Sequence, residues 1–595
     1  MEKGMLTYRC YGRHGQGKQE RTDGREAAAS YLLIEEAVCP ICKSRDHVEV
    51  ESRLYWCTHC RIPLYEKNCP LCHAPAEEFV RDCRIVFPEE KRLLELLMEA
   101  EPGTYDHSSV WNGGGIYYAD GLRLPLEITK LSEEQIRRAA QKIPEAFRNI
   151  DTREFEWMRE RFVRANCRRF CELETEAVDY IRTSVERYGI SKCYVSFSGG
   201  KDSTVVAELV RRALGMELMH GFADTTLELP QTLEYIRRYR RSHPDIYFID
   251  AKSRGEQFEA LCEILGPPSR VMRWCCTVFK TSALNRRLEM CFPEGEILSF
   301  QGIRRAESYG RRKYDRTSHK NKIGRQITAS PIIDWQDFDV WLYIATTGID
   351  FNQAYRLGYA RVGCWCCPNN STWSEILAQI YMPQQHRSFK RLLLDFAVKT
   401  NKKDPEEYVR TGQWKARLGG YGLAHAKQSV VSYTPCVNEA DAYHYELTRP
   451  VTASFFELWK PFGWIHRELG SRHLGEVYVL DRDKMPVLRL QAREGDVAVK
   501  IVVEALDRMG TKSRDKARRY VEAQITKYQM CIGCHACEEL CPHGALHCDT
   551  EGYRINDEKC FRCRKCINYF SGGCYIRKIL SIPRQQRSKH EQENR

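Results

Sequence analysis

The sequence predicts an α/β protein whose centre is a doubly wound parallel sheet. Between residues 192 and 347, short apolar strands alternate with helical stretches, which is the pattern of parallel strands connected by helices. A glycine-rich loop joins the first of these strands to a helix, and ligands of such sheets bind beyond the carboxyl ends of the strands. Cysteine pairs in Cys-x2-Cys spacing lie before and after this region, which predicts metal-binding modules on both sides.

Apolar periodicity and helix-start signals give the expected elements. The run Ser132-Glu133-Glu134-Gln135 has capping-box spacing and opens a helix. Residues 475–503 are rich in strand patterns, and a basic helix covers 513–528. In the sheet region we expect strands at 192–197, 217–222, 245–250 and 296–300, and helices at 154–188, 204–214, 229–240 and 337–347.

Length and composition indicate several globular domains. A chain of 595 residues is too long for one core, and about three to five domains are expected. A hydrophobic content of 43% with 11% aromatic residues is typical of globular protein. We assign residues 1–100 to a zinc-ribbon-type module, 101–150 to a linker or small subdomain, 151–400 to the sheet domain, 401–525 to a mixed α/β spacer or a domain that handles RNA or substrate, 526–582 to a cysteine-rich α+β domain, and 583–595 to a disordered tail.

The cysteines indicate the compartment. Most of the 28 cysteines stand in Cys-x2-Cys pairs, which favours metal centres in a reducing compartment over a disulfide framework. No apolar run approaches the roughly 18 to 20 residues of a membrane span, and the first residues lack the apolar core of a signal peptide. We therefore expect a soluble, cytoplasmic protein with no membrane partner.

The formal charge of +12 leaves two interpretations open. Clustered basic faces suit a polyanionic partner such as tRNA or DNA, but a chain of this size also carries such charge for solubility alone. The basic clusters lie at residues 159–169, 237–241, 304–325 and 512–519.

Three cysteine pairs lie close together near the N-terminus. Cys39/Cys42 and Cys57/Cys60 are separated by an alternating stretch at residues 47–56, which predicts the hairpin of a zinc ribbon. Four thiolates from two such knuckles suit structural zinc. The third pair, Cys69/Cys72, either replaces the first pair as the partner of Cys57/Cys60 or helps to form a second site.

The loop Ser198-Gly199-Gly200-Lys201-Asp202-Ser203 follows the strand at 192–197 and opens a helix. Backbone N–H groups at a helix N-terminus bind anions, and the two glycines allow an oxyanion to approach the backbone. The spacing differs from the Gly-x4-Gly-Lys-Ser/Thr nucleotide loop. It resembles the pyrophosphate loop of ATP pyrophosphatases, which adenylate a substrate and release pyrophosphate, and so implies ATP with magnesium.

Three further motifs narrow this resemblance. They are Phe222 to Thr232 after the second strand, Cys275 to Lys280 before a helix, and Gln301 to Ser308 after the next strand. Together with the loop, they resemble the phosphoadenosine phosphosulfate (PAPS) reductase family over roughly residues 185–375.

The resemblance implies roles for the residues of these motifs. Lys201 and the loop amides would neutralise phosphates, and Asp202 would hold magnesium or accept a hydrogen bond from the nucleotide. Arg304 and Arg305 would act as forked donors over the phosphates. Asp224 and Glu228 would contact nucleotide or metal, with helix capping as the alternative.

Two differences from the sulfonucleotide reductases favour ATP as the nucleotide. Their phosphate loop usually departs from Ser-Gly-Gly-x-Asp-Ser, whereas the ATP-type loop is intact here. They also carry a nucleophilic cysteine in a C-terminal Glu-Cys-Gly-x-His motif, which this sequence lacks.

A vicinal cysteine pair and a later Cys-x2-Cys pair point back toward sulfur chemistry. Cys275, Cys276, Cys364 and Cys367 resemble the ligand set of adenylylsulfate reductases, which implies a 4Fe-4S cluster; zinc is the alternative, although vicinal ligands are unusual for zinc. Cys366 would then be a spare thiol, either a sulfur carrier or nucleophile or a buried passive cysteine.

The C-terminal cysteines match a two-cluster bacterial ferredoxin. The first run, with spacing x2, x2 and x3, ends in Cys541-Pro542, and the fourth cysteine of each run ligates the other cluster in such domains. We therefore expect one 4Fe-4S cluster on Cys531, Cys534, Cys537 and Cys574, and another on Cys560, Cys563, Cys566 and Cys541.

These features favour an ATP-dependent sulfur-transfer enzyme that adenylates an acceptor and draws electrons from its ferredoxin-like domain. The basic surface suggests a tRNA or DNA acceptor, as in the tRNA thiolation and DNA phosphorothioation enzymes of this superfamily, and we expect a protein that donates electrons or sulfur. A ferredoxin-fused sulfonucleotide reductase that releases sulfite is the first alternative. A non-enzymatic iron-sulfur protein that binds nucleotide is the second.

Overall fold

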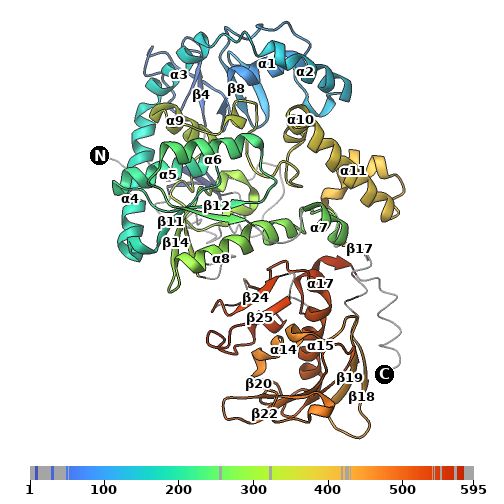
Figure 1. Cartoon of the computed structure of the whole chain (residues 1–595). Helices are drawn as coiled ribbons and strands as arrows, with labels where there is room; N and C mark the ends of the chain where they lie inside the picture. Colours follow the sequence, from blue (N-terminus) through green and yellow to red (C-terminus); the bar gives the residue numbers. More distant parts are fainter. Residues whose placement is uncertain are drawn as a thin grey trace, which may run out of the picture.

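The computed structural model describes most of the chain (Figure 1). The described residues are 7–10, 29–32, 48–50, 53–252, 258–319, 325–416, 420–421, 428, 430–538, 541, 543–549, 552–568 and 573–581.

The central sheet is the predicted parallel one. Its strand order is β13-β12-β11-β14-β16-β15, and all neighbouring strands are parallel except β15, which is antiparallel at one edge. The sequence analysis missed β15 and β16. The strands are β11 (Cys193–Ser196), β12 (His220–Asp224), β13 (Phe248–Lys252), β14 (Ile297–Phe300), β15 (Thr317–Ser318) and β16 (Gln326–Ala329).

Helices cover this sheet, and the predicted helix at 154–188 is in fact two. α3 (Arg153–Ala165) and α4 (Cys167–Tyr188) are divided at Asn166, whose amide donates to the carbonyls of Pro63 and Phe162 while its oxygen accepts from the N–H of Tyr65. The break exists because Asn166 ties the helices to the N-terminal module. The other helices are α5 (Lys201–Leu214), α6 (Pro230–Ser242), α7 (Phe258–Leu265), α8 (Ser282–Cys291), α9 (Asp337–Thr347), α10 (Thr372–Tyr381), α11 (Pro383–Lys399) and α12 (Pro405–Arg410).

Among the described residues of the N-terminal module, the two strands within residues 47–57 do not pair as the predicted hairpin. β3 (Val48–Val50) pairs with β1 (Thr7–Cys10), which also pairs with β2 (Ala29–Leu32). β4 (Tyr55–Cys57) has both of its edges occupied, because β5 (Ile62–Leu64) and β6 (Glu77–Glu78) pair with it. Figure 1 shows β4 next to α3, above the central sheet.

A four-stranded antiparallel sheet, in the order β10-β9-β8-β7, occupies residues that the sequence left largely unassigned. The capping box predicted at Ser132 is confirmed, because its side chain accepts from the N–H of Gln135 at the start of α2. The elements are β7 (Arg84–Ile85), α1 (Pro88–Leu97), β8 (Val110–Gly113), β9 (Ile116–Ala119), β10 (Leu122–Arg123) and α2 (Glu133–Ala146).

The C-terminal part combines an antiparallel sheet with the ferredoxin-like segment. The sheet has the order β18-β19-β23-β22-β21-β20, and buried residues of both segments form one core with α15. The elements are β17 (Gly420–Tyr421), β18 (Ser432–Pro435), β19 (Ala442–Glu446), α14 (Ala453–Glu457), β20 (Trp464–His466), β21 (Glu476–Leu480), β22 (Pro486–Gln491), β23 (Ala498–Val503), α15 (Arg514–Met530), β24 (Leu546–Asp549), β25 (Gly552–Ile555), α16 (Lys565–Asn568), α17 (Tyr575–Ile579) and β26 (Leu580–Ser581).

Membrane-spanning helices are absent from the described ranges, where no helix is both long enough and apolar enough to cross a bilayer.

Candidate functional site

The glycine-rich loop lies between the end of β11 and the start of α5, at the carboxyl edge of the sheet. Gly199 has φ +71°, and a side chain there would come within 3.1 Å of Thr232 and Ile236. A Cβ on Gly302 would lie 2.6 Å from the carbonyl carbon of Asp202. Two segments thus pack directly on the loop, and both glycines are required for that approach.

Hydrogen bonds from the loop itself and from a later segment fix its shape. The N–H of Ser198 donates to the hydroxyl of Ser203 at 3.2 Å. The N–H of Lys201, the first residue of α5, donates to the phenol oxygen of Tyr355 at 2.9 Å, and Asn352 donates to the carbonyl of Gly199 at 3.0 Å. Sequence reasoning missed Tyr355 and Asn352, because no motif around them signals their role.

Four charges meet at the loop: two buried cations and two partly exposed carboxylates. The Lys201 Nζ lies 3.0 Å from a carboxylate oxygen of Asp202 and 3.2 Å from one of Asp337. Arg304 contacts the same two carboxylates at 2.6 and 2.7 Å. The structure therefore brings together three predicted residues, Lys201, Asp202 and Arg304, and adds Asp337 from the first turn of α9.

The charges in this network set one another's protonation. Burial lowers the pKa of Lys201, but the carboxylates of Asp202 and Asp337 outweigh it and hold the pKa above its ordinary value. Burial raises the pKa of Asp202, yet Arg304 and Lys201 bring it below its ordinary value. All these groups are thus charged at neutral pH, and an anionic ligand could replace the carboxylates as the partner of the two cations.

Arg305 points to different partners from those of Arg304. Its guanidinium contacts Asp334 at 2.5 Å and donates to the carbonyl of Tyr314 at 3.1 Å. These contacts tie Arg305 to residues that precede β15 and follow β16, and not to the four-charge network.

Asp224 and Glu228 shape the turn that follows β12. Asp224 accepts from the N–H of Thr226 at 2.8 Å, and Glu228 accepts from the N–H and the hydroxyl of Thr225. Neither carboxylate caps α6, whose N-cap is Leu229. Burial raises the pKa of Glu228.

The same turn connects the nucleotide side of the sheet to the inner cysteines. Glu228 forms a backbone bridge with Cys364, and the Thr225 hydroxyl lies 3.3 Å from the Cys364 sulfur. A Cβ on Gly200 would lie 3.2 Å from Val362, two residues before Cys364. The loop and the cysteine segment therefore pack against each other through Thr225, Glu228 and Val362, which we call the shared wall.

Four predicted cysteines meet on the other side of this wall. Cys276 begins a π-helical segment (Cys276–Thr281) that leads into α8, and such segments are frequent at functional sites. Cys275 interacts electrostatically with Cys276 and Cys364, while Cys367 interacts with Cys276 and Cys364. These interactions place Cys275, Cys276, Cys364 and Cys367 near one another, and their shared role as cluster ligands stays a prediction.

Cys366 is embedded in the hydrophobic core. It is 6% exposed, and burial raises its pKa well above that of an ordinary thiol. Because a nucleophilic cysteine requires access and a low pKa, this environment favours the passive alternative.

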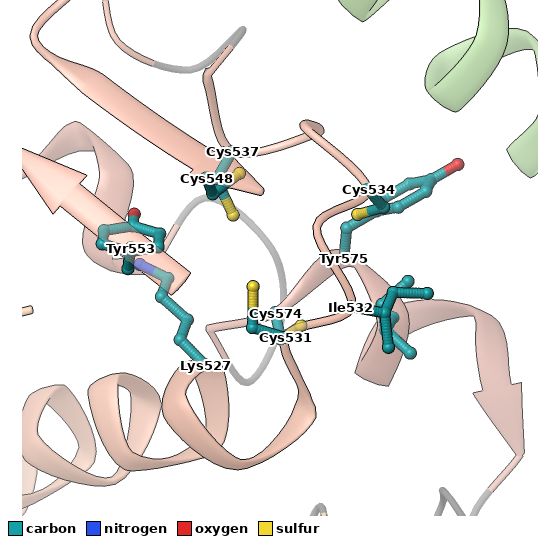
Figure 2. Close-up of a pocket in the computed structure, with 10 residues that line it drawn as sticks. Lys527, Cys531, Ile532, Cys534, Cys537, Cys548, Tyr553, Cys574 and Tyr575 are labelled. Atoms are coloured by element: carbon teal, nitrogen blue, oxygen red, sulfur yellow. The ribbon is translucent and has the colours of Figure 1, made fainter. Parts of the chain in front are cut away.

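The first ferredoxin-type set also converges. Cys531, Cys534, Cys537 and Cys574 line one pocket together with Cys548, and Figure 2 shows their side chains around a common space. Burial raises the pKa of Cys531 to about 11 and that of Cys574 to about 12. Sequence reasoning missed Cys548 on β24, which stands outside the Cys-x2-Cys pattern.

The second ferredoxin-type set has fewer contacts among its cysteines. Cys560 and Cys566 both interact electrostatically with Cys541. Cys563 is exposed.

A buried lysine lies between the two sets. Lys527 of α15 is 2% exposed and lines the first pocket. The hydrogen bond with Cys548 and the charge of Lys527 hold the pKa of Cys537 below its ordinary value, whereas burial raises the pKa of Cys566 to about 11 against the opposing charge of Lys527. Its ammonium donates to Gln524 and to the Cys566 carbonyl, and it forms no ion pair with a carboxylate in the described part of the chain. A buried cation among thiols fits centres whose thiolates carry negative charge.

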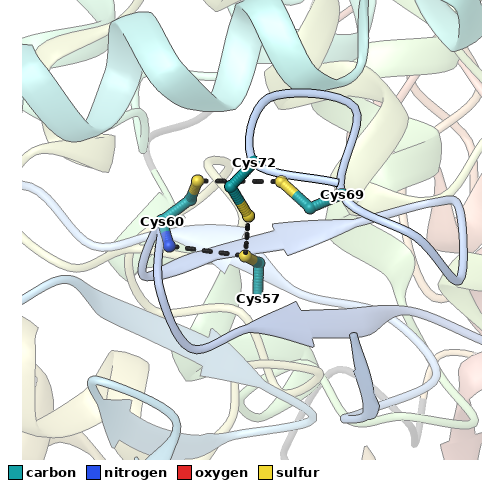
Figure 3. A group of neighbouring side chains, drawn as sticks. All are labelled: Cys57, Cys60, Cys69 and Cys72. Carbon is teal, nitrogen blue, oxygen red and sulfur yellow. Dashed lines mark hydrogen bonds between the residues drawn. The ribbon is translucent and has the colours of Figure 1, made fainter. Parts of the chain in front are cut away.

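The spacing of the sulfur atoms distinguishes the N-terminal set from the others. Cys57, Cys60, Cys69 and Cys72 form a group whose ligand atoms all lie within 4.8 Å of one another, whereas none of the other three cysteine sets forms such a group within the described ranges (Figure 3). Sulfurs at about 2.3 Å from a tetrahedral zinc lie about 3.8 Å apart. The contacts of 3.5 Å between Cys57 and Cys72 and 3.7 Å between Cys60 and Cys69 are close to that value.

The partner of Cys57/Cys60 is therefore Cys69/Cys72, the alternative that the sequence left open. Cys39 and Cys42, which were predicted to form part of a zinc site, lie outside the described residues. Wider separation suits the iron-sulfur sets, because a cluster holds its thiolates farther apart than a single ion does.

Most arginines of the basic clusters are paired with carboxylates. Arg169 contacts Asp339 in the interior, Arg238 contacts Asp350, and Arg518 contacts Asp515. Arg304 belongs to the loop network described above, and Arg305 contacts Asp334. Pairing of this kind favours the interpretation of these clusters as structural or solvated charges.

Comparison with known proteins finds family matches for two regions of the chain. A family model described as the phosphoadenosine phosphosulfate reductase domain matches residues 192–370, and one described as a 4Fe-4S binding domain matches residues 527–547. An uncharacterized protein of Methanocaldococcus jannaschii is 33% identical over 254 residues, which cover 42% of this chain and 51% of that protein. The chain spans about half the length of the two relatives from that organism.

Two further matches are to named reductases. An adenosine 5'-phosphosulfate reductase of Shouchella clausii is 26% identical over 195 residues, which cover 32% of this chain and 77% of that protein. The phosphate complex of phosphoadenylyl-sulfate (PAPS) reductase from Candida auris covers 40% of this chain and 97% of its own, with 16% identity and a TM-score of 0.26. Residues 192–370 therefore match the phosphoadenosine phosphosulfate reductase domain, and the same chain matches a 4Fe-4S binding domain at residues 527–547.

Proposed function

We propose that this protein binds ATP with magnesium at the Ser198 loop, adenylates an acceptor and couples this step to iron-sulfur-dependent sulfur transfer. The observation that carries the proposal is the shared wall between loop and cysteines: Thr225 and Glu228 contact Cys364, and Val362 packs against Gly200. An acceptor atom activated at the loop would stand next to the inner cysteine set.

In this proposal, the residues of the loop network bind the phosphates and activate the acceptor. Phosphate oxygens replace the carboxylates as partners of Lys201 and Arg304, which frees Asp202 to hold the magnesium that accompanies ATP. An acceptor oxygen attacks the α-phosphorus, the bond to the bridging oxygen breaks, and pyrophosphate leaves against the loop amides. Positioning and charge neutralisation supply most of the catalysis in such transfers.

Each centre has a defined set of protein ligands in this proposal. When bound, the 4Fe-4S clusters supply single electrons that reduce a sulfur carrier. The ligands are Cys531, Cys534, Cys537 and Cys574 for one cluster, Cys541, Cys560, Cys563 and Cys566 for a second, and Cys275, Cys276, Cys364 and Cys367 for a third; Cys57, Cys60, Cys69 and Cys72 hold a structural zinc ion.

Sulfur from a donor protein then displaces AMP from the activated acceptor. A tRNA or DNA acceptor, as in nucleic acid thiolation, suits this chemistry. The ion pairs of the basic clusters mean that the contact with such an acceptor would have to come from other surfaces.

A second function is favoured by the named relatives. The match to an adenosine 5'-phosphosulfate reductase covers 77% of that protein, and the inner cysteine set fits a reductase centre. This function requires a sulfonucleotide and reductant, releases sulfite and needs no ATP. A third candidate, a nucleotide-responsive iron-sulfur binding protein, requires neither reaction.

The test uses anaerobically purified protein with reconstituted iron and sulfide. ATP, magnesium and a tRNA or DNA fraction should yield pyrophosphate and AMP, while adenylylsulfate under reducing conditions should yield no sulfite. Lys201→Ala should abolish pyrophosphate release, whereas Lys192→Ala, an exposed lysine just before β11, should retain it. Sulfite without ATP would establish the second function, and neither product would leave the binding role.

Metal analysis of the same sample counts the centres. Iron near twelve atoms per chain is expected for three 4Fe-4S clusters, and iron near eight would remove the inner cluster from the proposal.

A further inference from the structure

The C-terminal part packs against the sheet domain next to both cysteine sets. Figure 1 shows α17 on the side of that part that faces α7 and α8. Buried residues from both parts, among them Trp274, Phe389 and Tyr528, belong to one continuous hydrophobic cluster. The two parts are therefore held in a fixed arrangement.

Tyr575 lies between the two cysteine sets. It immediately follows Cys574, and its hydroxyl donates to the hydroxyl of Thr277 at 3.2 Å. Thr277 in turn immediately follows Cys276. Figure 2 shows the Tyr575 hydroxyl pointing from the pocket toward the green ribbon of the sheet domain.

The pKa of Tyr575 is also affected by cysteines of both sets. Burial raises the pKa of Tyr575 above its ordinary value, the hydrogen bond with Thr277 lowers it, and the neighbouring thiols of Cys534, Cys275 and Cys276 raise it. One side chain is thus close enough to interact with thiols from both sets.

A second contact holds the C-terminal part against the sheet domain. Arg286 of α8 lies 3.6 Å from Glu538 and 3.2 Å from a ring nitrogen of His535. These two residues stand between Cys534 and Cys541 in the first ferredoxin run, and Glu538 also accepts from the N–H of Cys548 at 2.8 Å. The loop that carries the first set is therefore clamped to the helix that follows Cys276.

From this geometry we infer that Tyr575 and Thr277 form the junction through which electrons pass between the first ferredoxin-type set and the inner cysteine set. The inference rests on the proposed function, because it requires a redox centre at Cys275, Cys276, Cys364 and Cys367. It goes further in naming the contact and in assigning the set that contains Cys574, rather than the one that contains Cys563, as the neighbour of the inner centre.

The proposed step transfers a single electron. One electron leaves the centre on the first set and reduces the inner centre by one electron, and no covalent bond forms or breaks. The electrons come from a low-potential one-electron reductant, for which a photoreduced deazaflavin serves in the test.

The test follows intramolecular transfer and needs no substrate. Reconstituted full-length protein is photoreduced and frozen at successive times, and the electron paramagnetic resonance signal of each centre is recorded. Tyr575→Leu should slow the appearance of the inner signal several-fold, and Tyr575→Phe, which keeps the ring but loses the hydrogen bond, should slow it less. The signals after full reduction should be the same in all variants.

Tyr528→Phe is the matched control, because Tyr528 is also buried and its hydroxyl holds the C-terminal part together through Pro450 and Thr452. It should leave the transfer rate unchanged. Equal rates in wild type and both Tyr575 variants would overturn the inference, as would an equal slowing by Tyr528→Phe.

Failure of the proposed function gives a different result. A missing inner signal in wild type, with iron near eight per chain, would remove the centre itself and the junction with it. Rapid transfer without pyrophosphate release would keep the junction and reject the adenylation.

Discussion

Single residues decide the charge balance at both centres. At the loop, two buried cations and two partly exposed carboxylates neutralise one another, so a nucleotide must exchange partners within an existing network. At the ferredoxin-type sets, Lys527 is a buried cation with thiols on two sides. An isolated buried charge is costly, and thiolates at these sets would balance it.

Lys527→Met should therefore lower the reduction potential of the first ferredoxin-type centre. The reduced state carries one more negative charge, and removal of the nearby cation destabilises it by an amount on the order of tens of millivolts. A redox titration followed by electron paramagnetic resonance measures this shift. Lys516→Met, an exposed site on the same helix, should not change the potential.

Short elements and loops carry the site at the next scale. β14 ends in a segment whose Gly302 approaches the backbone of Asp202, and β12 ends in the turn that contacts Cys364. The loops after neighbouring parallel strands meet at one edge of the sheet, which explains why motifs far apart in the chain share one site.

Gly302→Ala should weaken nucleotide binding and lower the stability of the sheet domain. Its Cβ would fall 2.6 Å from backbone atoms that cannot move aside easily, and overpacking of this kind costs about 1–3 kcal/mol. Thermal unfolding and ATP binding by calorimetry measure the two effects. Gly310→Ala meets no atom within 4 Å and should behave like wild type.

The N-terminal cysteine group should hold one zinc ion that stabilises its module. Cys69→Ser should release this zinc and lower the melting temperature, because the tetrahedral site would lose one of its four thiolates. Zinc analysis and thermal unfolding are the measurements. Cys167→Ser, at an exposed cysteine outside the group, should keep the zinc, and zinc retained by Cys69→Ser would contradict the assignment.

In the whole molecule, two other parts of the chain contact the sheet domain at its sites. The C-terminal part supplies Tyr575 beside Thr277. The N-terminal part supplies Asp82, whose two oxygens each accept at 3.0 Å from the N–H groups of Asp337 and Phe338 at the start of α9. A carboxylate from outside the sheet domain thus supports the helix that carries Asp337 to the loop.

This contact should make stability depend on pH. Burial and the nearby charge of Asp337 raise the pKa of Asp82 from 3.8 to about 7, so the folded protein binds this proton more tightly than the unfolded chain. The contribution to stability is complete below the unfolded value and is lost as the pH rises to about 7.

Asp82→Asn should remove this part of the pH dependence. The loss of melting temperature between about pH 5 and about pH 8 should be smaller in this variant than in wild type. Asp179→Asn, an exposed aspartate on α4, should keep the wild-type profile. Parallel profiles for wild type and Asp82→Asn would contradict the assignment.

Local patterns in the sequence predicted much of the fold. Apolar strands, the capping box at Ser132 and the glycine-rich loop depend on neighbouring residues, and the helix at 337–347 has the predicted bounds. The sequence analysis joined α3 and α4 because both sides of Asn166 are strongly helical, and only the contact with Pro63 and Tyr65 interrupts them.

By itself, the sequence determined the parallel sheet, the phosphate-type loop and which cysteines belong to metal-ligand spacings, because these depend on residue type and short separations. Only the tertiary structure decided the pairing of Cys57/Cys60 with Cys69/Cys72, the partners of Lys201, the burial of Cys366 and the place of Tyr575 between two cysteine sets. Each of these depends on contacts between segments that are distant in the chain or on burial in a shared core, and such contacts leave no periodic signal in the sequence.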